Sequence, residues 1–205
     1  MFPTKFTKPL LGLDWLEWYG DHKVYHPAID LGLAGQSDCG QEVVAPKSGF
    51  IEYIYDAEWG SGGFGKFIIM VHSDGNFTRY AHLQSIAVKQ AQEVKAGQVI
   101  GYLGRTGTTS CHLHWEVMNP DGAELQRKHW KAWRMYPSNW SKQEVQKYYI
   151  NPWTWVEDVG IPVWAVEAVK WAQENEIITN VLQESVDDVR LAKILHNFYI
   201  KFVKP

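Results

Sequence analysis

The sequence is poor in cysteine, has no long apolar run and carries little net charge. Two cysteines among 205 residues are too few for a framework of disulfides. Apolar stretches stay well short of the roughly 20 residues that a membrane-spanning helix needs, so we expect no integral membrane segment. A net charge of −3 offers no basic surface for nucleic acid or for an anionic membrane. The composition predicts a globular protein with one ordinary core and an appendage.

The N-terminus lacks the apolar segment of a secretory signal. Residues 1–10 combine prolines and lysines instead, so we expect no signal peptide. Cys39 and Cys111 leave two alternatives open, a single bridge or two reduced thiols, and their spacing to the histidines does not resemble a structural zinc knuckle.

Tryptophan, by contrast, is abundant. Seven of the eleven tryptophans fall in residues 130–171. Aromatic crowding of this kind indicates either a well-filled small core or an exposed surface that stacks against a ligand. We take the core as the default interpretation.

The middle of the chain is predicted to be β. Alternating, β-branched and aromatic segments predict strands at 42–46, 49–54, 66–72, 77–83 and 99–103, with glycine-containing turns between them. Short strands at this spacing predict a compact antiparallel sheet, folded as a sandwich or an open barrel. The glycine-rich stretch 60–65 is followed by neither Lys-Ser/Thr nor a helix, so we interpret it as a hairpin tip and not as a phosphate loop.

A His-x-His pair lies in the predicted strand 111–117. Alternation places His112 and His114 on one face, with Cα atoms roughly 7 Å apart. That spacing is too wide for easy chelation of one ion, but it suits one imidazole on a metal and the other beside a metal-bound water. Two histidines on a half-exposed strand are the plainer alternative.

A second candidate pair is His26 and Asp30. Pro27 and Gly32 argue against a helix here, although helical spacing would put the pair on one face. In a straight strand the two residues would be ~13 Å apart. The chain must therefore bend at Pro27-Ala28 if both side chains bind one ion.

Taken together, the motifs closely resemble those of the lysostaphin/LytM-type zinc metallopeptidases over roughly residues 22–118. The matching motifs are His26-x-x-x-Asp30, Tyr80-Ala81-His82-Leu83, Val94-Lys95-Ala96-Gly97-Gln98-Val99-Ile100-Gly101, Gly104-x-Thr106-Gly107 and His112-Leu113-His114-Trp115-Glu116. Asn151-Pro152 is similar to the family's closing Asn-Pro. The resemblance implies a mainly β, LytM-like catalytic domain that uses Zn²⁺ to hydrolyse peptide bonds in bacterial peptidoglycan.

Carried over by position, the resemblance makes His26, Asp30 and His114 the zinc ligands, and His82 and His112 the catalytic histidines. Three protein ligands leave the fourth position that a catalytic zinc site keeps open. We hypothesise that His112 takes a proton from the zinc-bound water and that His82, protonated or donating through Nε2, stabilises the oxyanion. Ala28 and Cys111 depart from the usual glycine and the usual proline or small residue.

Three nearby residues receive weaker roles. Alternation puts Tyr80 on the face of His82, so it lines a substrate groove or simply packs. Thr106 lies in a turn beside the site and is a second candidate for the groove. Glu116 is ~13 Å along the strand from His112, which favours a supporting role behind the ligands or at the rim of the site over that of general base.

The chain divides by pattern into three parts. We predict an N-terminal arm at 1–21, the metallopeptidase domain at 22–159 and a helical C-terminal domain at 160–205. Residues 119–150 form an insertion, with a helix over 122–134 and another after Ser141, where Glu144 completes a capping box. The insertion forms a wall of the substrate groove or a lid packed on the sheet, and the lid is slightly favoured.

The C-terminal segment carries two helical stripes, predicting a small α-helical hairpin. It also weakly resembles one S-layer-homology repeat. Cell-wall binding is therefore one interpretation, and packing or homo-oligomerisation is the other.

The function predicted from these features is that of a zinc-dependent peptidoglycan endopeptidase, of the phage endolysin type. Its synthesis would be cytoplasmic, and it would reach the wall during phage release, on a virion or by non-classical export. A catalytically inactive LytM-type scaffold or activator is the alternative, although such proteins lose ligands and all five positions are filled here. A zinc D-Ala-D-Ala carboxypeptidase of another family would need a Glu-x-x-His element, which the chain lacks.

Overall fold

The computed structural model describes residues 3–4, 10–11, 13–20, 23–32, 39–57, 63–128 and 139–157. The chain divides into two units, 1–155 and 156–205, and nearly all described residues belong to the first. The predicted C-terminal hairpin at 160–205 lies outside the described residues, as do residues 60–62 of the glycine-rich stretch and residues 129–138 of the insertion. These predictions remain untested.

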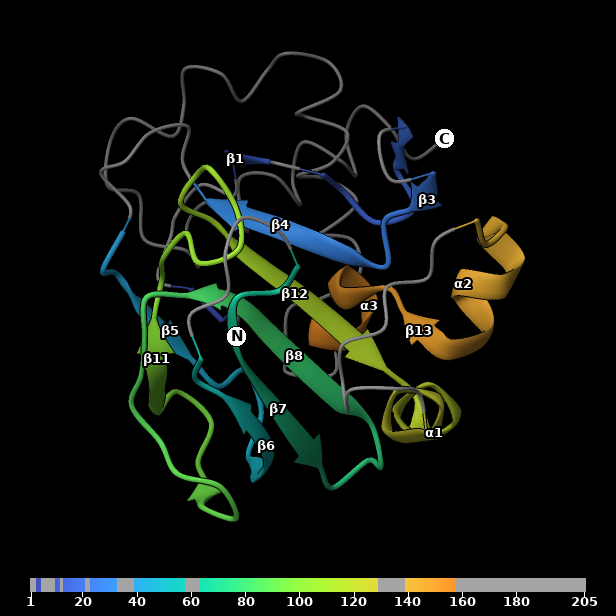
Figure 1. The fold of residues 1–205 in the computed structure, drawn as a ribbon. Coiled ribbons are helices and arrows are strands. Elements are labelled where there is room, and N and C mark those ends of the chain that lie inside the picture. The colour runs from blue at the N-terminus through green and yellow to red at the C-terminus, as the bar shows by residue number, and fades with distance from the viewer. Residues whose placement is uncertain are drawn as a thin grey trace, which may run out of the picture. The chain divides into compact units, whose positions relative to one another are not determined.

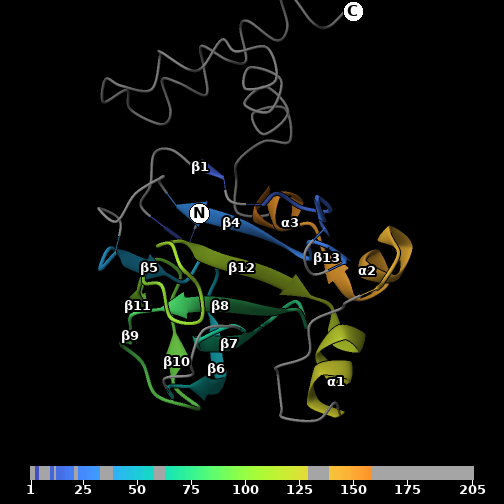
Figure 2. The ribbon, with the colours of Figure 1, turned by 45° about the horizontal axis from the view of Figure 1, so that its top comes forward.

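The described part of the first unit is built mainly from antiparallel strands (Figures 1 and 2). The largest sheet has the order β1 (Leu10–Leu11), β4 (Ala28–Gly32), β12 (Leu113–Met118), β8 (Phe77–Leu83), β7 (Lys66–His72), β6 (Gly49–Tyr55), β10 (Glu93–Val94), and β13 (Tyr149–Ile150) pairs with β12 outside this order. A second sheet joins β5 (Glu42–Val44), β11 (Val99–Tyr102) and β9 (Ser85–Ile86), and β2 (Trp18–Tyr19) pairs with β3 (Val24–Tyr25). The predicted β fold is confirmed.

The centre of the large sheet is buried. Every residue of β4, β8 and β12 is buried, and β7 is buried at five of its seven positions. The largest fully buried side chains include Trp115, Tyr80 and Phe67. Both faces of these strands are therefore covered, and the polar side chains among them, such as Arg79 and Glu116, are buried too.

The insertion packs on this core. Helix α1 (Pro120–Lys128) contributes Ala123, and helix α2 (Lys142–Tyr148) contributes Val145, to a cluster that contains Phe77 and Met118. Helix α1 begins two residues earlier than predicted because the Asn119 side chain accepts a hydrogen bond from the Gly122 amide. The predicted capping box of α2 is present, since Ser141 and Glu144 bond reciprocally. The described part of the insertion is packed on the sheet.

A third helix, α3 (Pro152–Glu157), follows Asn151. Its residue Trp153 donates through Nε1 to Asp14 Oδ1 over 2.7 Å, and Trp155 donates to Asp74 Oδ2 over 3.0 Å. These bonds join the first residues of α3 to segments that lie much earlier in the first unit. Within the described ranges, no helix is long and apolar enough to cross a membrane.

Candidate metal centre

Strand pairing brings together groups that lie far apart in the sequence. Strand β12 runs between β4 and β8, so that His114 faces Asp30 on one side and Ala81 on the other. Directly paired residues of antiparallel strands have Cβ atoms about 4.5–5.5 Å apart. The register thus places a carboxylate of β4 beside an imidazole of β12, which the sequence pattern alone does not reveal.

His26 reaches the same point because the chain bends at Pro27 between β3 and β4. Its backbone is fixed by two hydrogen bonds, Leu16 N to His26 O over 2.9 Å and His26 N to Glu17 O over 2.8 Å. His26 Nε2 lies 3.4 Å from Asp30 Oδ1, far closer than a straight strand would allow. The bend that the sequence analysis required is present.

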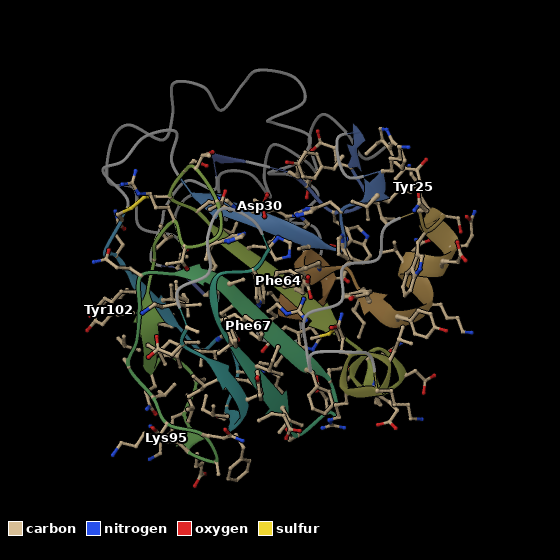
Figure 3. All side chains as sticks on the ribbon, viewed as in Figure 1. Tyr25, Asp30, Phe64, Phe67, Lys95 and Tyr102 are labelled. Atoms are coloured by element: carbon tan, nitrogen blue, oxygen red, sulfur yellow. A yellow bond between two sulfur atoms is a disulfide. The ribbon has the colours of Figure 1, made fainter. Side chains whose placement is uncertain are left out.

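Three atoms form a nearly equilateral triangle at this point. His26 Nε2 is 3.1 Å from His114 Nδ1, which is 3.0 Å from Asp30 Oδ1. Metal bonds of 2.0–2.1 Å in a tetrahedron separate ligand atoms by about 3.3–3.4 Å, so the triangle needs little adjustment to hold zinc. All three residues are buried, and Figure 3 shows Asp30 on β4. These residues fit a divalent metal ion.

Asp30 and His114 shift each other's pKa. Burial by itself would raise the pKa of Asp30, but hydrogen bonds with His114 and His26 hold it well below its usual range. Burial would lower the pKa of His114, yet hydrogen bonds with Asp30 and Glu116 raise it to about 9. Without metal, His114 therefore carries protons on both ring nitrogens at neutral pH. A bound metal would take the place of the Nδ1 proton.

A buried ion pair supports His114 from behind. His114 Nε2 donates to Glu116 Oε1 over 2.8 Å, and Arg79 Nη1 lies 2.9 Å from Glu116 Oε2. The side chains of Arg79 and Glu116 are completely buried, and the Arg79 guanidinium lies 3.9 Å from the Phe64 ring centre. Burial would raise the pKa of Glu116, but Arg79 holds it below its ordinary value. This arrangement keeps the Nε2 proton on His114 and directs Nδ1 toward the metal position.

The sequence analysis expected Glu116 either behind the ligands or at the rim of the site. The structure places it behind the candidate ligand His114, fully buried. The sequence analysis did not single out Arg79 because its role depends on register: Arg79 and Glu116 are direct partners across β8 and β12.

His82 is aimed at the centre by a bulge in β8. Between the pairs Lys66–Leu83 and Ile68–Tyr80, β8 contains two residues and β7 only one. His82 adopts φ 62°, a left-handed conformation that a bulge accommodates and that recurs at functional sites. Its Nδ1 donates to Thr106 O over 2.9 Å, and its ring centre lies 4.6 Å from that of His112.

His112 lies just before β12 and is less enclosed. Its Nδ1 donates to Ser110 O over 3.1 Å, and its Nε2 lies 3.9 Å from Asp30 Oδ1. Burial lowers the pKa of His112, and burial together with His112 and His114 lowers the pKa of His82 to about 3. Both rings are thus neutral with the proton on Nδ1, which leaves Nε2 as a proton acceptor on each. His82 can donate through Nε2 to an oxyanion only after it has gained a proton.

Of the two groove candidates, Tyr80 is fully buried and Thr106 is half-buried. Tyr80 therefore does not line a solvent-accessible groove, and the alternation argument fails because the bulge intervenes between it and His82.

Thr106 Oγ1 donates to Leu83 O over 2.8 Å and accepts from Lys66 N over 2.9 Å. Gly65, with φ 59°, lets the chain pass so close that a β-carbon there would overlap the Thr106 carbonyl.

The two cysteines form a bridge. Cys39 and Cys111 are joined with Cα atoms 5.5 Å apart. Of the two alternatives that the sequence left open, the structure has the disulfide. It fixes the residue immediately before His112.

The fold and this geometry define a class, namely antiparallel β proteins with a buried His/Asp/His group suited to one metal ion. A family model described as peptidase family M23 matches residues 25–127, half of the chain. The chain belongs to peptidase family M23.

Relatives differ in their named roles. The murein hydrolase activator NlpD of Salmonella dublin is 42% identical over 120 residues, which cover 56% of this chain and 30% of that protein. Lipoprotein NlpD of Yersinia enterocolitica is 40% identical over 78 residues, covering 38% of this chain and 77% of the relative. The antimicrobial peptidase lysostaphin of Staphylococcus simulans is similar in structure, with a TM-score of 0.52 and 22% identity over 87% of this chain and 55% of that one. The chain spans less than a third of the Salmonella relative, and the likeness to lysostaphin concerns the fold alone.

Proposed function

We propose that the protein is a zinc-dependent endopeptidase that hydrolyses peptide bonds in bacterial peptidoglycan. The observation that carries this proposal is the triangle of His26 Nε2, Asp30 Oδ1 and His114 Nδ1, with separations of 3.0–3.4 Å. Beside it lie two histidines, His82 and His112, whose Nδ1 atoms donate to backbone carbonyls and whose Nε2 atoms carry no proton. A scaffold without catalysis would need neither the ligand triangle nor the histidine pair. Membership of a peptidase family supports the same reaction class.

The proposed division of labour follows from protonation. Zinc held by the triangle would supply Lewis acidity toward a peptide carbonyl and would lower the pKa of water to ~7. His112 Nε2 accepts a proton from the attacking water and returns it to the leaving amine, because this nitrogen lies beside Asp30 and its ring is partly exposed. Asp30 favours the charged form of His112 that results. His82 orients the attacking group through its unprotonated Nε2.

The test combines metal analysis with cleavage. Protein stripped by a chelator and reloaded with zinc is mixed with purified cell walls, turbidity is followed, and released peptides are identified by mass. We expect one zinc per chain and new amino termini from a single kind of peptide bond. Loss of turbidity that persists equally after metal removal would contradict the proposal.

A second candidate is activation of another cell-wall hydrolase, since 42% identity connects the chain to a protein named as a murein hydrolase activator. In that case the zinc-loaded protein alone releases no peptide, but it accelerates wall digestion by an added hydrolase. The same wall assay, run with and without the second enzyme, separates the two functions.

We place either activity at the bacterial cell wall. The phage-type origin and the route of export remain predictions; the Yersinia relative is named a lipoprotein.

A further inference from the structure

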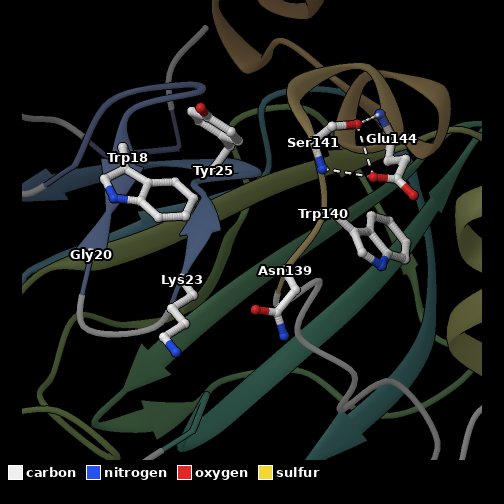
Figure 4. Close-up of a pocket in the computed structure, with 8 residues that line it drawn as sticks. All are labelled: Trp18, Gly20, Lys23, Tyr25, Asn139, Trp140, Ser141 and Glu144. Atoms are coloured by element: carbon white, nitrogen blue, oxygen red, sulfur yellow. Dashed lines mark hydrogen bonds between the residues drawn. The ribbon is translucent and has the colours of Figure 1, made fainter.

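A groove of about 610 Å³ lies between the β2–β3 hairpin and the N-terminus of α2 (Figure 4). Its lining consists of Trp18, Gly20, Lys23, Tyr25, Asn139, Trp140, Ser141 and Glu144. Four of these residues belong to the insertion 119–150, for which the sequence analysis left a groove wall as one alternative, and the other four come from the segment around β2 and β3. Trp18 is 52% exposed, which is unusual for so large an apolar side chain.

The aromatic rings of the groove are held in place. Trp18 and Tyr25 are direct partners in the hairpin, with ring centres 4.9 Å apart. On the other wall, Trp140 packs against Tyr148 with ring centres 5.3 Å apart. The backbone amide of Asn139 donates to Lys23 O over 2.7 Å and ties the two walls together. Rings fixed in this way can bind a flat apolar surface without a large loss of side-chain entropy.

The polar groups of the groove are mixed in kind and balanced in charge. Figure 4 shows Lys23 and Asn139 side by side below the two tryptophans, where they offer ammonium and amide groups. Ser141 N and Oγ both donate to Glu144 Oε2, over 2.7 Å and 2.8 Å, so this carboxylate is fixed by the helix cap. One lysine and one carboxylate do not favour a polyanion. Aromatic faces with a few convergent polar groups suit a ligand that has both apolar faces and hydrogen-bonding edges.

We infer that this groove binds the glycan strand of peptidoglycan, a chain of N-acetylated hexopyranoses; the inference rests on the proposed function. The C–H faces of such sugars stack on indole rings, while their hydroxyl and acetamido groups bond to amide, hydroxyl and charged side chains. The groove is also next to the metal centre in the chain. Tyr25 directly precedes the ligand His26, so their Cα atoms are about 3.8 Å apart. A glycan strand held here places its attached peptides beside the centre.

The binding test uses the full chain and a defined probe, the tetrasaccharide of β-1,4-linked N-acetylglucosamine, which carries no peptide. Calorimetric or NMR titration of wild-type protein is expected to show saturable binding. Trp18→Ala and Trp140→Ala should each weaken it by about tenfold, whereas Trp18→Tyr and Trp140→Phe, which keep a ring, should retain most of it. Phe50→Ala is the matched control, because Phe50 is also 52% exposed but lies on β6 outside the groove.

A second assay separates this inference from the proposed function. Cleavage of a short peptide without sugar should proceed equally in wild type and Trp18→Ala, whereas cleavage of intact walls should fall several-fold in the variant. No binding of the tetrasaccharide by wild-type protein, or equal binding by Trp18→Ala and Phe50→Ala, would overturn the glycan site while leaving peptide cleavage intact. Failure of peptide cleavage in every protein, with tetrasaccharide binding preserved, would instead overturn the proposed function.

Discussion

The two sides of the metal centre are built in different ways. On one side, Asp30 and His114 are ligand candidates on paired strands, and their separation is fixed by the register of β4 and β12. On the other side, His82 sits in a bulge and His112 precedes its strand, and each ring is oriented by one loop carbonyl. Strand pairing sets the geometry of the candidate ligands, and loop contacts set the protonation of the histidines beside them. Variants can therefore separate metal binding from turnover.

The largest effect is expected from His114→Ala, which removes the ligand on β12. Metal analysis should find less than a tenth of the wild-type zinc, and wall cleavage should fall by ~10³-fold or more because the metal supplies the main chemistry. The variant should also be less stable, since Glu116 and Arg79 lose a buried hydrogen-bonding partner. Normal zinc content in the variant would remove His114 from the triangle of ligands.

His112→Ala tests the loop side. Zinc content should stay at the wild-type level, while cleavage falls by about 10²–10⁴-fold, the usual contribution of a general acid or base. Thr109→Val is the matched control, because Thr109 is an exposed residue of the same loop. An unchanged rate in His112→Ala would show that another group handles the proton.

A pair of double variants tests the support behind His114. Arg79→Met with Glu116→Gln keeps a hydrogen-bond acceptor for His114 Nε2, whereas Arg79→Met with Glu116→Leu removes it; both avoid an unpaired buried charge. Zinc affinity should be about 10–100-fold weaker in the second than in the first. A competition titration with a chelator measures the difference. Equal affinities would mean that Glu116 contributes only to packing.

Metal affinity should also rise with pH. The pKa of His114 in the metal-free protein is about 9, so below that value a metal must displace a proton from it. The apparent affinity for zinc should therefore increase about tenfold per pH unit from pH 7 toward pH 9, and then level off. Competition titrations in a series of buffers measure the slope. A flat profile would indicate that His114 is already deprotonated at neutral pH.

The smallest effect is expected from Thr106→Val, which removes the hydroxyl bonded to Leu83 O and Lys66 N. Two half-buried hydrogen bonds contribute about 1–3 kcal/mol to the free energy of unfolding. Cleavage should fall only several-fold, because the Thr106 carbonyl that orients His82 is retained. Thr109→Val, at an exposed position of the same loop, should change neither quantity.

The sequence was most informative where local patterns decide structure. Strand segments, the α2 capping box and the bend at Pro27 are all local, and each is found in the structure. Sequence patterns did not predict features that depend on how one strand pairs with another. Tyr80 and His82 do not share a face because β8 bulges against β7, and Arg79 meets Glu116 only through the register of β8 and β12. The aromatic groove joins the segments around Trp18 and Trp140, which no local pattern of the sequence brings together.

The bridge between Cys39 and Cys111 also bears on which ions the protein can accept. Because the two sulfur atoms are bonded to each other, neither is a thiolate that could bind a metal. The described groups of the triangle therefore offer only nitrogen and oxygen donors. Thiophilic ions such as Cu(I) have no soft ligand there, whereas imidazole and carboxylate suit zinc and cobalt(II). Reduction of the bridge would place a thiol next to His112 and widen the range of competing metals.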